Sequence, residues 1–362
     1  MQPTLIEHPI GKQTSQLYYG QDASVTLDSL PEKSVHMVCT SPPYWGLRDY
    51  DQEDQLGQET DVEDYLQRLV SMCAKVHRVL RDDGTLWVNL GDSYGGSGFA
   101  SSVSDGRDTS KDKKQLIGVP WRFALAMKAA GWILRQDIIW HKPNGMPEQV
   151  RDRFTRSNEY IFLFSKKEHY FFDVDAVREP AVTYDGYRRR KNVWSIPTQP
   201  YQGAHFAAWP EEMVSIMVRS GTSQRGCCAS CQTPYKPNLV LTDLQEEDVL
   251  AKRGVGGYPA RYDGGTRAKT FGGGLTTRYQ TEGYVQDCKC PTQEVLPCVV
   301  MDIFSGSGTT GKVSMDHGRS YIGLDLNADY LPLALNRIQH VQSSVTPTPQ
   351  PDFDWAEELD FG

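Results

Sequence analysis

The sequence contains no run of 18 consecutive apolar residues, so it predicts no membrane-spanning helix. Its first residues, MQPTLIEHPIGKQ, lack the charged segment followed by an apolar stretch that marks a signal peptide. We therefore expect a soluble cytoplasmic protein with no membrane partner. In that reducing compartment the eight cysteines do not predict a disulfide framework, and they favour metal binding instead.

An excess of basic charge is also lacking, because 38 Lys and Arg stand against 46 Asp and Glu and the net charge is −8. The overall balance argues mildly against a nucleic-acid partner. The distribution argues the other way: residues 101–200 contain 18 basic and 12 acidic side chains, and residues 251–280 contain 6 basic and 1 acidic. Two basic regions on an acidic protein can bind a polyanion through their local potential, although an ordinary solvated surface would have the same composition.

The chain of 362 residues, 39% of them apolar, is long enough for a full α/β core and one smaller module. Residues 60–84 have the clearest helical spacing, and Thr60 and Glu63 predict a capping box at its start. Strands are expected at 34–40 and 85–90. Near the C-terminus, strand, glycine loop, helix, strand and helix alternate, which is the βαβα pattern of a doubly wound, mostly parallel sheet.

The glycine loop FSGSGTTGKV, residues 304–313, admits three interpretations. A phosphate-binding loop would need Ser or Thr after Lys312, where Val313 stands. A dinucleotide-binding loop fits the three glycines, and Asp325 lies near the distance at which an acid binds ribose hydroxyls. That fold begins with its loop, however, and only 51 residues follow Gly311. The third interpretation is a site for the methionine end of S-adenosylmethionine.

The third interpretation requires a permuted sheet with a partner motif near the N-terminus, and TSPPYWGLRDY at 40–50 provides one. Ser41-Pro42-Pro43-Tyr44 and Phe304-Ser305-Gly306-Ser307-Gly308, in this order, resemble the two motifs of the β group of amino-methylating DNA methyltransferases. The similarity extends through LWVNLGDSY, RQDIIWHKP, YIFLFSK and GLDLNADY. The resemblance implies an α/β, circularly permuted AdoMet-dependent methyltransferase fold with a doubly wound, mostly parallel sheet.

Between the two motifs, residues 223–292 change character: glycine, cysteine and basic residues become frequent and regular periodicity is lost. We therefore expect an inserted target-recognition region and a zinc-binding module. The expected organisation is a first catalytic part (1–166) with a mobile loop at 95–118, a target-recognition segment (167–200), a helix flanking the cofactor (201–222), a Cys-rich zinc module (223–292), an AdoMet-binding βαβα unit (293–342) and a flexible tail (343–362).

The resemblance implies direct methyl transfer from S-adenosylmethionine to an exocyclic amine of a flipped base in duplex DNA. The lone pair of such an amine is delocalised into the ring, and acceptors for both amine hydrogens would redirect it toward the sulfonium methyl. Ser41 offers a hydroxyl and Pro42 a carbonyl, which the rigid Pro42-Pro43 pair preorganises. Tyr44 offers a ring on which an extruded base can stack. No enzyme nucleophile is needed, so we expect Cys39 to pack within its strand.

Cofactor contacts follow from the family motifs at the matching positions. Asp302 is expected to bind the amino group, Asp325 the ribose hydroxyls and Asp22 the adenine amino group. A simple helix cap is the alternative role for Asp22. The glycines allow close approach of the methionine portion, and the predicted cofactor set is completed by Phe304, Gly306, Ser307, Gly308, Thr309 and Thr310.

Four cysteines form two close pairs, Cys228 with Cys231 and Cys288 with Cys290. Two such pairs predict a tetrahedral thiolate site for a structural Zn²⁺. The metal would tie together a segment too poor in apolar residues to fold alone. Cys227 could replace Cys228, and four free thiols on loops are the alternative.

Three basic clusters are predicted to contact double-stranded DNA, mostly at phosphates, with one arginine available to read guanine. The clusters are Arg151, Arg153 and Arg156; Arg188, Arg189, Arg190 and Lys191; and Arg261, Arg267 and Lys269.

Serine at position 41 resembles the residue at this place in enzymes that make N4-methylcytosine. Aspartate there is typical of N6-adenine methylation, which is the alternative activity. Intact motifs argue against a non-catalytic DNA-binding regulator on a decayed scaffold. The serine, in place of an asparagine, argues against RNA or protein-glutamine methylation. Members of the group often dimerise and accompany restriction nucleases, so a homodimer and a cognate restriction endonuclease are candidate partners, in a bacterial, archaeal or phage setting.

Overall fold

The computed structural model describes residues 4–7, 12–47, 52, 54–95, 113–180, 187–199, 209–242 and 278–339. Most of the predicted mobile loop, the predicted tail, and Arg261, Arg267 and Lys269 lie outside these ranges. Among the helices within them, none is both long and apolar enough to cross a membrane.

A nine-stranded mixed sheet forms the centre of the molecule, in the order β1-β2-β15-β14-β3-β4-β6-β5-β9. The five neighbouring strands from β2 to β4 are parallel, while β1 and β6 run antiparallel to their neighbours. The strands are β1 (Thr4–Glu7), β2 (Thr14–Tyr19), β3 (Val35–Thr40), β4 (Leu80–Leu90), β5 (Ile133–His141), β6 (Asn158–Ser165), β9 (Val193–Ser195), β14 (Val299–Asp302) and β15 (Ser320–Asp325).

The C-terminal strands β14 and β15 lie in the middle of this sheet, between the N-terminal strands β2 and β3. In the parallel register of β14 with β3, Val300 pairs with Met37 and Met301 with Val38. The carboxyl ends of β3 and β14 are therefore adjacent. The loops that follow them, some 260 residues apart in sequence, start side by side.

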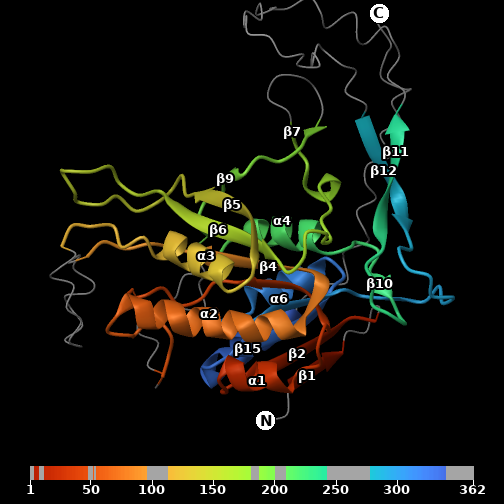
Figure 1. Cartoon of the computed structure of the whole chain (residues 1–362), viewed down its shortest axis with the longest axis horizontal. Helices are drawn as coiled ribbons and strands as arrows, with labels where there is room; N and C mark the ends of the chain where they lie inside the picture. Colours follow the sequence, from red (N-terminus) through yellow and green to blue (C-terminus); the bar gives the residue numbers. More distant parts are fainter. Residues whose placement is uncertain are drawn as a thin grey trace, which may run out of the picture.

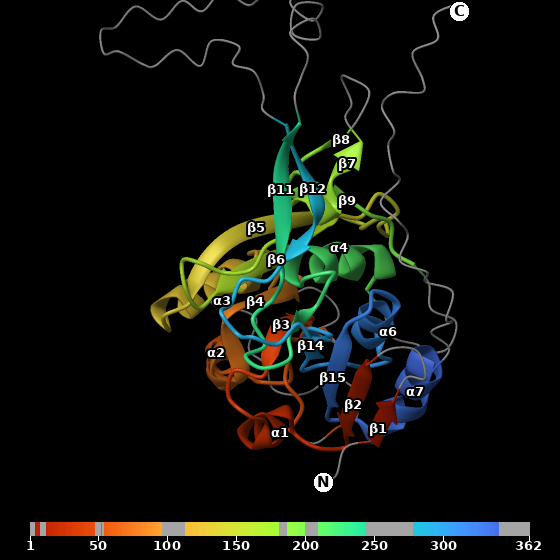
Figure 2. The ribbon, with the colours of Figure 1, turned by 90° about the vertical axis from the view of Figure 1, so that its right-hand side faces the viewer.

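Helices cover both faces of the sheet, with α1, α2 and α3 on one face and α4, α6 and α7 on the other (Figures 1 and 2). The two faces have separate apolar cores: one face has a core around α2 and α3, and the other has one around α4 and a smaller one around α7. The central strand β3 is buried along its whole length, as expected for a parallel strand covered on both sides. The helices are α1 (Ala23–Ser29), α2 (Val62–Val79), α3 (Val119–Ala129), α4 (Glu211–Gly221), α6 (Thr309–Asp316) and α7 (Leu331–Gln339), with 3₁₀ turns η2 (Asp175–Val177) and η4 (Ala328–Tyr330).

The helix predicted at 60–84 is shorter at both ends. Its cap is Asp61, whose carboxylate accepts a hydrogen bond from the backbone N–H of Glu63 at 2.8 Å, and not Thr60. The helix ends at Val79, because Leu80 turns to extended backbone and begins β4. Leu80 is fully buried and pairs with Val35, so burial against β3 overrides the local helical pattern.

Two short additions extend from this core. A two-stranded ribbon of β11 (Lys236–Thr242) and β12 (Arg278–Val285) projects from the body (Figures 1 and 2), and β10 (Cys227–Cys228) pairs with β13 (Val295–Leu296) at its base. The pair β7 (Glu179–Pro180) and β8 (Tyr187–Arg188) lies in the predicted target-recognition segment. The end of that segment, β9, joins the main sheet beside β5.

Candidate active site

One cavity of about 400 Å³ opens at the carboxyl ends of the parallel strands. It is lined by Ser41, Pro42, Pro43 and Tyr44 after β3, and by Phe304, Ser305, Gly306 and Ser307 after β14. The carboxyl ends of strands in open α/β sheets are where ligands bind, and this volume suits a small molecule. The two motifs therefore meet, as the third interpretation of the glycine loop required.

Tyr44 is fixed by a partly buried chain of hydrogen bonds. Its hydroxyl donates to Glu159 Oε2 at 2.7 Å and accepts from Asn89 Nδ2, also at 2.7 Å. Asn89 Nδ2 lies 2.9 Å from the same Glu159 oxygen, and Lys142 pairs with the other one. Burial, and next the Glu159 charge, raise the pKa of Tyr44 well above its ordinary value. The hydroxyl is therefore a neutral donor.

The Tyr44 ring lies against the backbone at Gly91. A Cβ at this position would come within 2.6 Å of Tyr44 Cε2, so only glycine leaves room for the ring. Among the described residues the Ser41 hydroxyl has only long contacts, 3.5 Å to Tyr44 Oη and 3.4 Å to Asn89 Nδ2. Hydrogen bonds of this length are weak, which leaves a lone pair of Ser41 available to a ligand in the cavity.

Asp302 lies buried between the two motifs. Its Oδ1 accepts from the Thr40 hydroxyl at 2.6 Å and from the Phe304 backbone N–H at 3.0 Å, while Oδ2 accepts from the Thr310 hydroxyl at 2.6 Å. Burial raises the pKa of Asp302 to about 6, although these hydrogen bonds oppose the shift. The carboxylate thus joins the end of β3 to the glycine loop.

Asp325, at the end of β15, holds the glycine loop itself. Its Oδ2 accepts from the Gly306 backbone N–H at 2.6 Å and its Oδ1 from the Asn327 N–H at 2.9 Å. Burial raises the pKa of Asp325 to about 6, against the effect of these N–H groups. Gly306 has φ 51°, and a Cβ there would meet no atom within 4 Å, so the loop presents bare backbone to open space.

Several of the other predicted cofactor residues already have hydrogen-bond partners within the protein. Asp22 caps α1 by accepting from the Ser24 N–H at 2.6 Å, and it also lines the cavity. Arg337 of α7 donates to the hydroxyls of Ser307 and Thr309 at 3.0 and 2.7 Å. Those two hydroxyls therefore have a partner within the protein already. Gly308, with φ 80°, is the residue before α6.

Asn89, Lys142 and Glu159 line the cavity but were not among the predicted site residues. Asn89 is a buried polar residue at the end of β4, a signal that the sequence offered in LWVNLGDSY. Glu159 is the second residue of β6, and it reaches this edge of the sheet only because β6 runs antiparallel to β4. Lys142 follows β5, and its ammonium lies 4.3 Å from the centre of the Trp140 ring, another lining residue.

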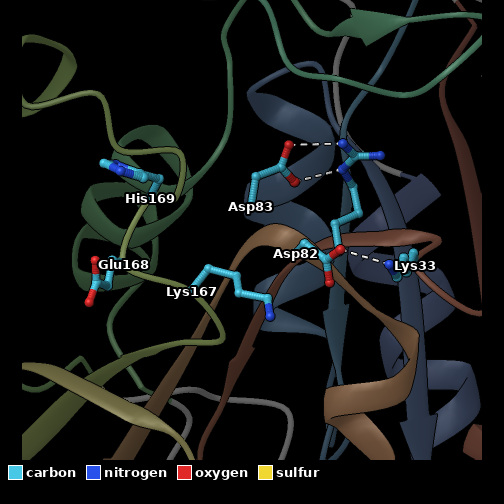
Figure 3. A pocket seen from close by; sticks show the side chains of 7 residues that line it. Lys33, Asp82, Asp83, Lys167, Glu168 and His169 are labelled. Atoms are coloured by element: carbon cyan, nitrogen blue, oxygen red, sulfur yellow. Dashed lines mark hydrogen bonds and ion pairs between the residues drawn. The ribbon is translucent and has the colours of Figure 1, made fainter.

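A second, more open depression of about 590 Å³ lies at the opposite, amino end of β3 and β4 (Figure 3). It is lined by charged residues that pair with one another: Arg81 with Asp83 at 2.8 Å and Lys33 with Asp82 at 2.7 Å. Because these charges neutralise each other and the walls are exposed, the cavity beside Ser41 is the better candidate for chemistry.

Of the predicted DNA contacts, Arg151, Arg189 and Lys191 are exposed. The other contacts within the described residues, Arg153, Arg156, Arg188 and Arg190, have partners within the protein. Arg153 pairs with Glu148, and its guanidinium lies 3.9 Å from the centre of the Tyr94 ring. Arg156 donates to the Asp92 carbonyl, and Arg188 and Arg190 both pair with Glu179. The four predicted metal ligands, Cys228, Cys231, Cys288 and Cys290, lie together at the base of the ribbon.

Comparison with known proteins decides the family. The N6/N4 methyltransferase family model, described as DNA methylase, matches residues 35–229 and 298–336, and so includes both motifs. The chain belongs to this DNA methylase family. The Type II methyltransferase M.XycI of Xanthomonas campestris pv. cyanopsidis is 36% identical, over 93% of this chain and 92% of its own. M.SmaI of Serratia marcescens is 35% identical, over 88% of each chain.

Solved structures share the methylase fold. The PvuII DNA methyltransferase (cytosine-N4-specific) has a TM-score of 0.55 at 18% identity, over 90% of this chain and 86% of its own. TTHA0409 of Thermus thermophilus, a putative DNA modification methylase solved with S-adenosyl-L-methionine, has a TM-score of 0.50 at 19% identity, over 91% of this chain and 96% of its own. At these identities the likeness concerns the fold.

Proposed function

We propose that this methylase transfers a methyl group from S-adenosylmethionine to the exocyclic N4 amine of a cytosine turned out of double-stranded DNA. The observation that carries the proposal is the shared cavity: the Ser41–Tyr44 tetrapeptide and the glycine loop line its two sides. The central place of β14 and β15 between β2 and β3 supports the interpretation of the sheet as circularly permuted.

The residues of the cavity fit the cofactor. S-adenosylmethionine is cationic and brings a sulfonium-bound methyl group with its own leaving group. Asp325, Asp302 and Asp22 place carboxylates in the cavity wall, and Gly306 leaves its backbone uncovered. In this proposal Asp302 orients the amino group, Asp325 the ribose hydroxyls and Asp22 the adenine amine, with Phe304 and the loop glycines in contact with the rest.

The tetrapeptide would prepare the base. The Ser41 hydroxyl and the Pro42 carbonyl would accept hydrogen bonds from the two amine hydrogens, which pulls the nitrogen toward tetrahedral geometry and frees its lone pair for the methyl carbon. As the new N–C bond forms and the S–C bond breaks, the sulfur would leave as a neutral thioether and the methylated amine would lose one proton to water. The Tyr44 ring stacks on the base, and its hydroxyl bond to Glu159 fixes the plane of the ring. Removing a base from the duplex costs a few kcal/mol, which stacking and these hydrogen bonds offset.

DNA binding would use the exposed basic residues Arg151, Arg189 and Lys191. Arg151 precedes the segment that returns to β6, and Arg189 and Lys191 lie close to β9, at the edge of the same sheet. We assign phosphate contacts to these residues, and target recognition to segments 167–200 and 223–292. A homodimer and a partner endonuclease remain predictions.

We favour cytosine over adenine as the substrate base because of one feature, the serine at position 41. The deciding experiment is mass analysis of nucleosides from duplex DNA incubated with the purified protein and S-adenosylmethionine. N4-methylcytosine is expected. N6-methyladenine would select the alternative substrate, and DNA that gains no methyl group while the protein binds the cofactor would overturn the proposal.

A further inference from the structure

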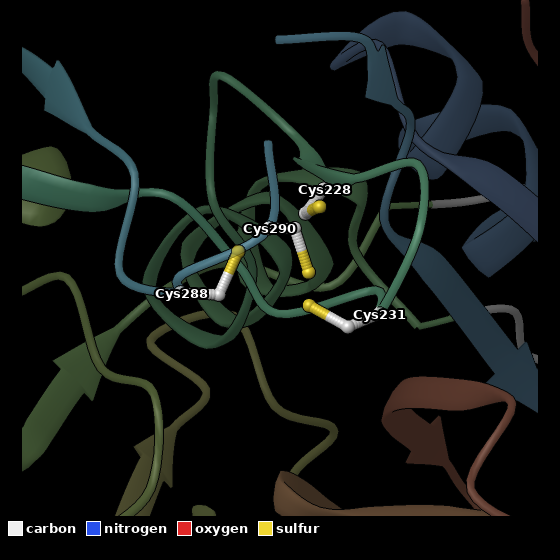
Figure 4. A group of neighbouring side chains, drawn as sticks. All are labelled: Cys228, Cys231, Cys288 and Cys290. Carbon is white, nitrogen blue, oxygen red and sulfur yellow. The ribbon is translucent and has the colours of Figure 1, made fainter. Parts of the chain in front are cut away.

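Four cysteine side chains converge at the base of the β11–β12 ribbon (Figure 4). Their sulfur atoms all lie within 4.8 Å of one another, although Cys228 and Cys231 precede the ribbon and Cys288 and Cys290 follow it. In a tetrahedral thiolate site with Zn–S bonds of about 2.3 Å, sulfur atoms are about 3.8 Å apart. The arrangement of the four sulfurs is thus close to the geometry that a zinc ion requires.

The backbone around the first pair is already folded into a ligand-bearing turn. Gln232 N–H donates to the Cys228 carbonyl at 2.8 Å, and Cys228 N–H donates to the Thr233 carbonyl at 3.0 Å. Gln232 has φ 59°, a left-handed conformation that a glutamine adopts only when its surroundings enforce it. This closed turn holds Cys228 and Cys231 with their sulfurs on one side.

Hydrogen-bond donors also hold the second pair, Cys288 and Cys290, in place. Gln286 Nε2 donates to Cys288 Sγ at 3.1 Å and to the Cys290 carbonyl at 2.9 Å. N–H donors to ligand sulfurs are the usual outer contacts of metal sites, because they stabilise thiolates and fix the ligand. The amide of Gln286 thus orients both members of the pair.

A neighbouring group of His36, Cys227 and Cys298 is buried and also has its ligand atoms within 4.8 Å of one another, but hydrogen bonds to the backbone occupy His36 and Cys227. His36 uses both ring nitrogens: Nδ1 accepts from the Val299 N–H at 3.0 Å, and Nε2 lies 2.9 Å from the Gln232 carbonyl, to which it donates. Cys227 Sγ points to the Leu296 carbonyl at 3.4 Å. This group therefore anchors the turn to the catalytic body, and it separates the roles of Cys227 and Cys228.

We propose that Cys228, Cys231, Cys288 and Cys290 bind one Zn²⁺ as four thiolates and that the metal closes the base of the β11–β12 ribbon. A two-stranded ribbon is marginally stable alone. Here the described hydrogen bonds from the ribbon strands to the body start from β12: the Tyr284 hydroxyl donates to Asp173 at 2.9 Å, and the Thr281 hydroxyl donates to Asp175 at 3.4 Å. The metal would fix the β11 side of the ribbon base, next to the Cys228–Cys231 turn that His36 holds.

Metal analysis of the full-length protein tests the assignment, and it needs no methyltransferase activity. Wild-type protein made with zinc present should contain about one zinc per chain. The zinc content per chain of the Cys228→Ala variant should fall more than about tenfold, whereas the Cys227→Ala variant, changed at the neighbouring residue, should keep its zinc. Cys231→His should retain metal, because imidazole can replace a thiolate. Wild-type protein without zinc, or zinc loss in Cys227→Ala but not in Cys228→Ala, would overturn the proposal.

A second measurement on the unmodified chain guards against variants that fail to fold. A thiol reagent should release zinc in step with modification of about four cysteines. After chelation, limited proteolysis should cut first at the ribbon, while S-adenosylmethionine binding by titration calorimetry should persist. Four thiols that react without zinc release, or a ribbon that resists protease equally before and after chelation, would contradict the proposed role.

Discussion

Tyr44 Oη donates to Glu159 Oε2 across 2.7 Å, which ties the loop after β3 to the start of β6. Glu159 is held in turn by Lys142, and Asn89 of β4 donates to both partners. Side chains from β4, from β6 and from the residue after β5 therefore fix the position of one aromatic ring in the cavity wall. In the proposed reaction this ring receives the base, so the buried polar chain supports substrate geometry and the fold together.

Tyr44→Phe and Tyr44→Ala should separate the hydroxyl from the ring. Tyr44→Phe removes a hydrogen bond to a charged group and should lower the free energy of unfolding in urea by about 1.5–3 kcal/mol. Methylation should persist, because the stacking surface remains. Tyr44→Ala removes the ring and should weaken productive DNA binding about 10–100-fold, measured by single-turnover methylation against DNA concentration. Full activity in Tyr44→Ala would refute the stacking role.

Ser41→Ala should lower the methylation rate constant by about 10²–10³-fold, since it removes an acceptor that acts on the amine as the bond forms. Cofactor affinity should not change, because the proposed mechanism places the Ser41 hydroxyl against the base and not against the cofactor. Ser34→Ala is the matched control: its exposed hydroxyl bonds only to the Pro31 carbonyl within the described structure. Equal rates in the two variants would remove Ser41 from the mechanism.

The sequence predicted the chemistry-bearing loops because their residue types carry the conformation. Consecutive prolines end β3, and glycines with positive φ form the loop after β14. Each motif is local, and the parallel pairing of the two strands brings them together. The family and its α/β methylase fold could therefore be inferred from two short stretches.

Asn89, Lys142 and Glu159 could not be found in the same way. Their meeting depends on β5 and β6 adding to the sheet in an antiparallel hairpin, a pairing that the local pattern of YIFLFSK does not encode. The end of α2 shows the same limitation. Helical periodicity continues to Leu80, but its burial against β3 places it in a strand. Tertiary contacts decided both cases.

Cofactor affinity should fall as the pH drops through about 6. Burial raises the pKa of Asp302 and of Asp325 to about 6, so both carboxylates are charged at pH 7.5 and largely protonated at pH 5. Protons then compete with a cationic ligand. Calorimetric titration with S-adenosylmethionine between pH 5 and pH 8 should show this dependence, and Asp325→Asn should reduce its slope.

The free energy of unfolding of the ligand-free protein should depend on the same two carboxylates in the opposite direction: it should fall as the pH rises. Their folded pKa values lie above the ordinary 3.8, so their favourable contribution is present at low pH and is lost as the pH rises through about 6. Urea unfolding from pH 4.5 to pH 7 should show a smaller decline in Asp325→Asn than in the wild type. An unchanged pH dependence in the variant would show that Asp325 does not titrate in this range.

Gly308→Ala should destabilise the protein by about 2–5 kcal/mol, for two reasons. The residue has φ 80°, and an added Cβ would lie 2.9 Å from Cα and Cβ of Ala334, so the backbone of α7 would have to move. Gly131→Ala is the matched control, because Gly131 has φ 94° and its Cβ would meet no atom within 4 Å.

The free energy of unfolding of Gly131→Ala, measured in urea, should therefore fall by only about 1–2 kcal/mol, which is the cost of placing alanine in a left-handed conformation. The difference between the two variants measures the packing of the glycine loop on α7. Because Arg337 of α7 also donates to Ser307 and Thr309, a displaced α7 would disturb the cavity wall. S-adenosylmethionine binding should accordingly weaken in Gly308→Ala and stay intact in Gly131→Ala. Equal losses of stability in both would mean that strain alone, and not this contact, requires the glycine.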